Sequence, residues 1–505
     1  LPHGVLFRGG EEGEIRKNLI ENNHIDAIIG LPANIFFGTG IPTIIMVLRQ
    51  RRENTDVLII DASKGFIKEG KNNKLRASDI KRIADTFIKR ESVAKFSRVV
   101  SREEIRSNDY NLNIPRYVDS SEAAEHWDVY ASMFGGIPTA EIDEMSEFWT
   151  AFPALKKALF TESGIPYVNV STPDIKSAIK SHPDVVGFEK TFNAAFSTFP
   201  AFLKEELIDR MGSIEISKAE TVLSADIFER LKDIPLIDKY AAFQLLDDDW
   251  TGISIDLEML QTEGFAATKK VDPNLVIKKK DGKDQEVQEG WVGHIIPFDL
   301  VQATLLSAET DELHGLESRL AEIPSEYESI LDEMTEEDKE SCNDVLTDEG
   351  DAFVPKEVSK KIKELKKDRS PESVALRTLL EKVESLVKSE KEIKAEIKAK
   401  GAALQAKTKD TIESLSDEQA LDLLEKKWIA PLIESIHKLP DTVIDSLVSK
   451  IQALQNKYAT TFFEVEQQIS ETEATLSGMI DDLEGNEYDM LGLNELKKLL
   501  GGSAE

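Results

Sequence analysis

An uncharged run of 22 residues, from Ala27 to Leu48, constrains the fold of this chain more than any other feature. A run of that length would be able to span a bilayer, and the three arginines that follow it resemble a cytoplasmic anchor. Pro32, Pro42 and three glycines interrupt the run, however, and leave two short pieces, IDAIIG and TIIMVL. Short β-branched pieces are typical of strands. The run therefore predicts two buried strands joined by a loop, and no membrane association.

Further strands and helices are predicted around this pair. GVLF (4–7) and VLIID (57–61) have strand composition without polar alternation, so we expect strands buried on both faces of an α/β sheet. EEGEIRKNLIENN (11–23) and DIKRIADTFIKR (79–90) have the apolar spacing of helices. In the second helix the residues predicted to share a face are Ile80, Ile83, Ala84 and Phe87. The segment is expected to be the last third of an α/β domain whose first strands are absent.

The charge of the chain is unevenly distributed. The 505 residues carry a formal charge of −32, yet residues 1–119 hold 20 basic and 16 acidic side chains. Because phosphate binding depends on lysine and arginine, any DNA contact is expected from residues 1–119 or from a partner. The acidic remainder suits solubility or the docking of a basic protein. A single cysteine, Cys342, excludes an internal disulfide framework and indicates a cytosolic protein.

Three further features resemble known sites, but a plainer interpretation is favoured for each. GFIKEGKN (65–72) nearly matches the phosphate-binding loop G-x-x-x-x-G-K-[ST], but Asn72 offers no hydroxyl for magnesium, so an ordinary charged loop is favoured. Asp61, at a strand end, could hold a ligand, but an Asp before Ala-Ser more often closes a turn through its own side chain. The seven histidines are scattered without HExxH spacing, so no metal site is predicted.

The segment IFFGTGIP (35–42) carries the remaining candidate chemistry. Two adjacent aromatics and a glycine-rich turn would lie at the mouth between two strands. An aromatic there could stack on an extruded base, with glycines letting the backbone come close. Composition by itself favours the plainer interpretation, in which one phenylalanine belongs to the core and the other covers a neighbouring helix.

The rest of the chain is predicted to be mostly helical. Residues 120–300 have helical spacing and no catalytic signature, which indicates an interaction-bearing extension, and VIKKKDGKDQEV (276–287) contains the Asp-Gly of a surface hairpin. EEDKESCNDVLTDEGDAF (336–353) is acidic and is expected to be a loose linker. SEKEIKAEIKAKGAALQAK (389–407) is expected to be a charged helix that is exposed away from Ile393 and Ile397.

Two apolar stripes at alternating spacings of three and four residues predict long coiled-coil helices. One stripe runs from Leu306 to Met334, with Pro324 expected to kink it or mark its start. The other runs from Ile444 to Leu483 with a stutter near Tyr458, and as an unbroken helix it would be about 60 Å long. The stripes could pair with each other as an antiparallel hairpin, or one of them could meet the helices of a partner.

The first 119 residues also resemble a known family. LPHGVLFRGGEEGEIRKNLIENNHIDAIIGLPANIFFGTGIPTIIMVLRQRR, VLIIDAS and NDYNLNIPRYVD (108–119) occur in the order found in the modification subunit of type I restriction–modification systems. These subunits are adenine-N6 DNA methyltransferases that use S-adenosylmethionine. KKWIAPLIESI and IQALQNKYATTF, within 426–462, are similar to the helical C-terminal tail of longer members.

The resemblance implies the C-terminal portion of such a subunit. The family's cofactor-binding glycine motif and its Asn-Pro-Pro-[Phe/Tyr] motif lie upstream of LPHGVLF, and no NPPF or NPPY occurs in the 505 residues. We therefore expect no S-adenosylmethionine bound to this chain, no catalytic residue in it and no DNA methylation by it alone. The implied fold is an incomplete Rossmann-like methyltransferase sheet in residues 1–119, a mostly helical extension in 120–300, and a coiled-coil region for subunit interaction in 301–505.

The resemblance also names site residues and partners. It places IFFGTGIP beside the target base, which makes either Phe36 or Phe37 a stacking residue. The implied substrate-binding residues are Phe36, Phe37, Gly38, Thr39, Gly40, Asn108, Tyr110, Asn111 and Arg116. For the last four, a turn that packs the domain onto its C-terminal extension is an equally good interpretation. The implied partners are the specificity subunit, the restriction subunit and, through the complex, double-stranded DNA.

Two alternatives stay open at this point. If the family role is right, deletion of residues 440–505 is expected to abolish co-purification with the specificity subunit. The main rival is a non-catalytic coiled-coil scaffold with a small α/β domain. An upstream reading frame that encodes NPPF or NPPY would favour the enzyme.

Overall fold

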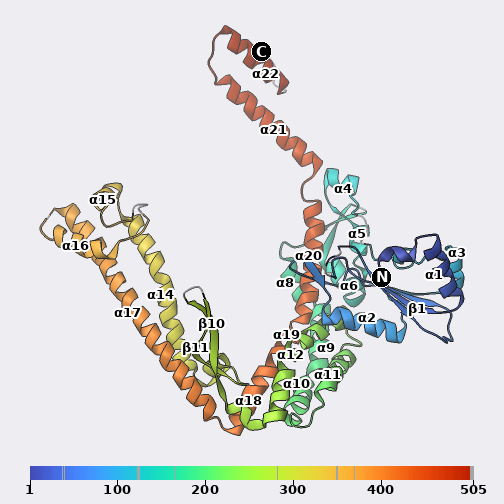
Figure 1. The fold of residues 1–505 in the computed structure, drawn as a ribbon. Coiled ribbons are helices and arrows are strands. Elements are labelled where there is room, and N and C mark those ends of the chain that lie inside the picture. Colours follow the sequence, from blue (N-terminus) through green and yellow to red (C-terminus); the bar gives the residue numbers. More distant parts are fainter. Residues whose placement is uncertain are drawn as a thin grey trace. The chain divides into compact units, whose positions relative to one another are not determined.

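The computed structural model describes residues 1–36, 38, 40–121, 125–164, 166–280, 283–347, 351–368 and 370–500. Figure 1 shows a mostly helical chain in which strands form small sheets. The chain divides into two compact units, each of them built from separate stretches of sequence. The first comprises Leu1–Ala201, Ser217–Thr251 and Leu432–Glu505, and the second comprises Phe202–Ile216 and Gly252–Pro431.

The N-terminal part of the first unit contains a four-stranded sheet in the order β2-β1-β3-β6. Its strands are β1 (Ile25–Gly30), β2 (Ile44–Leu48), β3 (Val57–Asp61) and β6 (Ser97–Val100). β1 and β3 are parallel, while β2 and β6 are antiparallel to their neighbours. The uncharged run thus forms two strands and a loop, as predicted. None of the described helices is long and apolar enough to cross a membrane.

Helices cover both faces of this sheet. Helices α1 (Glu11–Glu21) and α3 (Arg102–Ser107) contribute Ile20 and Ile105 to one buried cluster. Helix α2 (Ala77–Lys89) packs Ile83 and Phe87 against the other face. Every residue of β1 and β3 is buried, which confirms strands that are enclosed on both faces.

Two details of the predicted domain are wrong. GVLF forms a 3-10 helix, η1 (His3–Leu6), instead of a strand, because the buried Arg16 guanidinium donates to the carbonyl oxygens of Val5 (2.8 Å) and Arg8 (3.0 Å). On α2, Ile80 is exposed and Ser78 is buried. A second layer accounts for this shift, since the Ser78 amide donates to Oε1 of Gln244 (3.0 Å), so the helix is covered on two sides.

Beyond residue 126, the described part of the first unit is helical apart from a three-stranded sheet in the order β7-β9-β8. Its strands are β7 (Ile137–Pro138), β8 (Phe160–Gly164) and β9 (Tyr167–Val170). Its helices are α4 (Val129–Phe134), α5 (Thr139–Asp143), α6 (Ser146–Ala151), α7 (Leu155–Leu159), α8 (Ile175–Lys180), α9 (Pro183–Phe196), α20 (Leu439–Lys457), α21 (Phe462–Asp481) and α22 (Glu487–Leu499). Four helices contain residues of both units: α10 (Phe199–Leu203), α11 (Ile216–Arg230), α12 (Lys239–Glu263) and α19 (Ala430–His437).

The second unit contains a helical pair and the predicted hairpin (Figure 1). The hairpin strands are β10 (Val271–Lys280) and β11 (Lys283–Gly293), paired up to Lys280 and Lys283. The remaining elements are η3 (Lys204–Asp209), η4 (Phe265–Lys269), α13 (Phe298–Leu305), α14 (Ser307–Glu333), α15 (Glu336–Ser341), α16 (Pro355–Leu365), α17 (Pro371–Glu413) and α18 (Asp417–Trp428). α14 continues through Pro324, so this proline does not mark its start.

The first apolar stripe packs within the chain. α14 and α17 are antiparallel, because Glu309 pairs with Lys407 near one end and Glu333 pairs with Lys382 near the other. The partner of the first stripe is therefore the predicted charged helix, in which Ile393 is buried, and not the second stripe. The predicted loose linker is also wrong, since α15 lies within residues 336–353 and Cys342 and Val345 belong to a buried cluster with α16 and α17.

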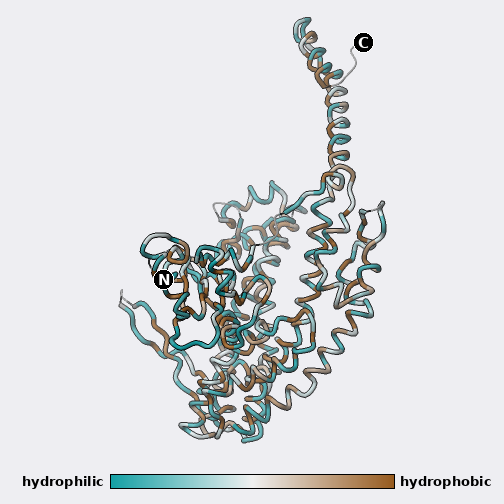
Figure 2. Tube along the Cα trace, turned by 90° about the vertical axis from the view of Figure 1, so that its right-hand side faces the viewer, coloured by the Kyte–Doolittle hydropathy of each residue, from teal (hydrophilic) through white to brown (hydrophobic). Residues whose placement is uncertain are grey.

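The second stripe is broken, which contradicts an unbroken helix over 444–484. α20 ends at Lys457, and Thr461 caps α21 by accepting from the Glu464 amide (3.1 Å). Apolar residues of α20 such as Ile444 and Leu447 are buried, whereas Ile469 and Met479 on α21 are 52% and 61% exposed. Hydrophobic positions recur along α21 (Figure 2), and most side chains of this helix are exposed. A coiled coil made by α21 stays a prediction.

Candidate functional site

The segment IFFGTGIP lies in the loop that leaves the carboxyl end of β1 and returns to β2. The Leu31 amide donates to the Thr43 carbonyl oxygen (2.9 Å) and closes the loop at its base. Asn34 has φ +54° and Gly38 has φ +81°, so the chain turns through left-handed backbone twice. The Phe36 side chain is 53% exposed. Phe37 and Thr39 lie outside the described residues.

A small hairpin holds this loop. Its strands are β4 (Ile67–Glu69) and β5 (Asn72–Lys74), and they contain the segment that nearly matches a phosphate-binding loop. Asn73 donates twice to the loop of Phe36, from its backbone amide to the Asn34 carbonyl oxygen (2.9 Å) and from Nδ2 to the Ala33 carbonyl oxygen (2.7 Å). Because β5 runs on from Lys71 where a phosphate-binding loop would begin a helix, the nucleotide interpretation fails.

Gly40 belongs to the same tight turn. A Cβ atom on Gly40 would lie 3.1 Å from Oδ1 of Asn34, closer than ordinary van der Waals contact. Gly38, by contrast, faces open space. The loop is therefore compact at its two ends and presents Phe36 to solvent between them.

Asp61 lies at the carboxyl end of β3, beside the same edge of the sheet. Its Oδ1 accepts from the Ser63 amide (3.0 Å), which confirms that the side chain closes a turn, and its Oδ2 accepts from the Ser120 hydroxyl (2.5 Å). Burial lowers the pKa of His3, and the nearby Asp61 carboxylate partly opposes that shift. A cavity of about 370 Å³ adjoins Asp61 and is lined by Lys64, Arg76, Arg82 and Lys95 among others. Nothing in the sequence indicated that His3 or Ser120 would lie near Asp61.

The polar residues of the 108–116 segment contact one another and helices of the same domain. Tyr110 donates to Oε1 of Glu21 on α1 (2.6 Å), and its carbonyl oxygen accepts from Nε of Arg16 (2.7 Å). Arg106 also donates to the Glu21 carboxylate, and these hydrogen bonds lower the pKa of Glu21 to about 2. Tyr110 is thus held against α1 within the α/β domain.

Three further predicted residues are engaged in the same turn. Nδ2 of Asn108 donates to the Glu104 carbonyl oxygen (3.0 Å), and Oδ1 of Asn108 accepts from Arg116 (3.4 Å). Oδ1 of Asn111 accepts from the Asn113 amide (2.9 Å). These contacts give the segment a packing role, with α1 and α3 as the elements it contacts. A role toward DNA stays a prediction.

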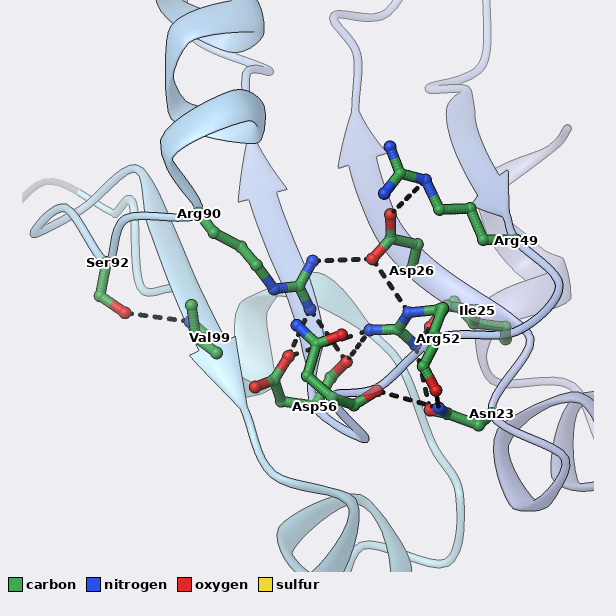
Figure 3. A network of polar contacts seen from close by, with 10 residues as sticks. Asn23, Ile25, Asp26, Arg49, Arg52, Asp56, Arg90, Ser92 and Val99 are labelled. Atoms are coloured by element: carbon green, nitrogen blue, oxygen red, sulfur yellow. Dashed lines mark hydrogen bonds and ion pairs between the residues drawn. The ribbon is translucent and has the colours of Figure 1, made fainter.

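The opposite edge of the sheet carries an arginine network that the sequence did not predict (Figure 3). Asp26, 3% exposed, pairs with Nε of Arg49 (3.2 Å), Nε of Arg52 (3.1 Å) and Nη1 of Arg90 (2.7 Å). Burial lowers the pKa of Arg52 despite the neighbouring carboxylates. Because Asp26 and Asp56 pair with these guanidinium groups, the network joins β1 to the segments that directly follow β2, precede β3 and follow α2. Two of the three arginines that resembled a membrane anchor, Arg49 and Arg52, therefore pair with carboxylates of the same domain.

The described residues show no metal centre, since no group of three or more His, Cys, Asp or Glu side chains among them could hold an ion. The cavity beside Asp61 does not suit S-adenosylmethionine. Its lining holds four basic side chains, Lys64, Arg76, Arg82 and Lys95, against the carboxylates of Asp61 and Asp79. This net positive charge disfavours a sulfonium cation, and Asp61 itself is engaged by Ser63 and Ser120. The carboxyl ends of β1 and β3 therefore carry the exposed aromatic ring of Phe36 and the basic side chains that line the cavity.

The sequence of the first domain is similar to known proteins. Residues 1–126 match the family described as N-6 DNA methylase. Within that class the similarity is to methylase subunits of type I restriction enzymes, which confirms the resemblance seen in the sequence.

The relatives match over a limited stretch. The MpnII methylase subunit of Mycoplasma pneumoniae is 40% identical over 127 residues, which are 25% of this chain and 23% of that protein. The MjaVII methylase subunit of Methanocaldococcus jannaschii is 41% identical over 135 residues, 26% of this chain and 23% of that protein. A crystal structure of a type I restriction-modification system methyltransferase subunit from Streptococcus thermophilus is 55% identical over 24% of this chain and 26% of that chain, with a TM-score of 0.24. The chain thus spans about a quarter of the length of these relatives.

Proposed function

We propose that this chain is part of the modification subunit of a type I restriction–modification system, an enzyme that methylates adenine at N6 in DNA. The observation that carries the proposal is the similarity of residues 1–126 to N-6 DNA methylases, in a domain that presents Phe36 from a braced loop. S-adenosylmethionine supplies the methyl group in such enzymes.

The role proposed for this chain is to hold the target base. An adenine taken out of the duplex leaves its stacking partners, and an exposed aromatic ring can replace them. Phe36 is 53% exposed, and Asn73 fixes the backbone on the side where the loop begins. Stacking on bases is worth about 1–3 kcal/mol per base. The aromatic ring would therefore lower the cost of extrusion without taking part in methyl transfer.

The proposed partners are a specificity subunit, a restriction subunit and double-stranded DNA. Support for a helical partner comes from α21, where Ile469, Leu476 and Met479 are exposed at helical spacing. Such a stripe is stable in water when another helix covers it. The acidic remainder of the chain disfavours direct DNA binding outside residues 1–119.

The proposal is tested in the host by mapping N6-methyladenine over the genome. Deleting the gene should remove methylation at one sequence motif, and the native gene should restore it. Phe36→Ala should restore about 10-fold less than the native gene at limiting expression, since the lost stacking is worth about 1–3 kcal/mol. Ile88→Ala, an exposed residue on α2, is the matched control and should restore methylation fully. An unchanged methylation map after gene deletion would favour a non-catalytic scaffold.

A further inference from the structure

We propose that the β4–β5 hairpin and the turn before it bind the phosphodiester backbone of duplex DNA through Lys64, Lys68 and Lys71. The choice of duplex DNA as the polymer rests on the proposed function, whereas the phosphate chemistry rests on the hairpin itself. The hairpin contains the one nucleotide-like motif of the sequence, and its β4–β5 fold leaves that motif without a role in nucleotide binding.

The hairpin geometry places Lys71 at the tip and Lys68 on one face of the strands. Gly70, with φ +62°, and Lys71 form the two-residue turn between Glu69 and Asn72, which places Lys71 at the tip. Lys68 pairs across the strands with Asn73, so their side chains share one face. On that face, the Asn73 side chain donates to Ala33 in the loop of Phe36. Lys68 is therefore on the face of the hairpin that meets the loop of Phe36.

Three lysines on and directly before the hairpin have no carboxylate partner. Residues 63–76 contain five basic side chains and one acidic side chain, in a chain of charge −32. Glu69 pairs with Lys74 (3.1 Å) on the other face, and Asp79 pairs with Arg76 (3.0 Å). Among the described residues, no carboxylate lies within ion-pair distance of Lys64, Lys68 or Lys71, and all three side chains are exposed. The arginines around Asp26 differ, because carboxylates of the same domain already satisfy them.

Phosphate is the ligand that this arrangement suits. Exposed ammonium groups without carboxylate partners repel one another, and a line of phosphates relieves that repulsion and releases its own counterions. Lysine contacts of this kind set position without reading sequence. Since Asn73 joins the hairpin to the loop of Phe36, a strand whose base reaches Phe36 would carry its neighbouring phosphates past the lysines. The hairpin would then fix the register of the strand while the loop holds the base.

The test measures binding of a fluorescein-labelled 30-base-pair duplex of arbitrary sequence to the purified 505-residue chain by anisotropy, between 50 and 200 mM salt. The variant Lys64→Gln/Lys68→Gln/Lys71→Gln is compared with Lys356→Gln/Lys363→Gln/Lys366→Gln. The control removes the same charge from exposed lysines on and directly after α16. Each phosphate contact contributes about 0.9 to the slope of log affinity against log salt. The hairpin variant should lower that slope by about 2.7, so its salt-dependent loss of affinity becomes roughly 40-fold smaller.

The outcomes are distinct. A slope that falls in the hairpin variant and not in the control supports the proposal, provided that both variants keep the far-ultraviolet circular dichroism and melting temperature of the native chain. Equal slopes in the two variants, or no salt-dependent binding by the native chain, overturn it. If these slopes behave as expected but gene deletion leaves the methylation map unchanged, the phosphate site stands and the proposed function fails. If gene deletion changes the methylation map but the two variants have equal slopes, the proposed function stands and the phosphate site fails.

Discussion

At the scale of single residues, the domain depends on a few buried charges whose partners are distant in sequence. Arg16 ties η1 to the segment that contains Tyr110, and Asp26 gathers arginines from the end of β2 and from α2. Buried charges of this kind cost little only while they stay paired. Neither group could be found from composition, because an arginine's partner is decided by the packing of strands.

We predict that Asp26→Asn destabilises the sheet by about 3 kcal/mol, because it removes the nearer and more deeply buried of the two carboxylates that pair with Arg52, whose side chain is 3% exposed. Asp56→Asn, at a side chain that is 32% exposed, should cost about 1 kcal/mol or less. Amide hydrogen exchange in β1 and β3 measures both effects locally, which suits a chain with two units. Equal losses of protection in the two variants would show that burial of the pair contributes nothing.

At the scale of elements, the loop of Phe36 is ordered from outside its own sequence. The Leu31–Thr43 hydrogen bond closes its base, but Asn73, 39 residues beyond Asn34, fixes its first half. The signal in the sequence was a near match to a phosphate loop, which pointed to a different chemistry. Strand register explains the discrepancy, since it places Asn73 beside the loop and Lys71 at the hairpin tip.

We expect Asn73→Ala to increase amide exchange about fivefold in the peptide that spans residues 31–43. The change removes the Nδ2 donor to Ala33 and keeps the backbone hydrogen bond to Asn34, a loss of about 1 kcal/mol. Asn72→Ala, on the other face of the hairpin, is the matched control and should leave that peptide unchanged. Exchange mass spectrometry reads both variants, and equal exchange in the two would remove Asn73 from the site.

At the scale of the whole molecule, the two apolar stripes have different fates. The stripe on α14 is buried against α17, and the first half of the second stripe is buried through α20. The second half, on α21, stays exposed. Deletion of residues 440–505 would therefore remove core residues such as Ile444 and Leu447 together with the exposed stripe, and a shorter deletion separates the two contributions.

We predict that a chain ending at Thr461 keeps its melting temperature within about 2 °C, because α21 and α22 bury almost no apolar side chains of their own. The same truncation should abolish co-purification with the specificity subunit, since it removes Ile469, Leu476 and Met479. Differential scanning calorimetry and affinity co-purification measure the two results. Complex formation that survives the truncation would place the docking surface elsewhere.

The sequence by itself determined the local elements of this protein. Proline and glycine divided an apolar run into β1 and β2, apolar spacing located α1, α2 and α14, and Asp-Gly located the β10–β11 hairpin. These features depend on neighbouring residues, so their signals lie within a few positions of one another. The motif order in residues 1–119 also indicated the family that the comparisons found.

Only the tertiary structure decided which of these elements meet. GVLF lies in η1, where Arg16 contacts it, and α14 pairs with α17. The second stripe is interrupted before Thr461 caps α21, and Asn73 contacts the loop of Phe36. The physical reason is that hydrogen bonds and ion pairs between distant segments form after chain topology brings them together. Periodicity and composition carry no record of those distances.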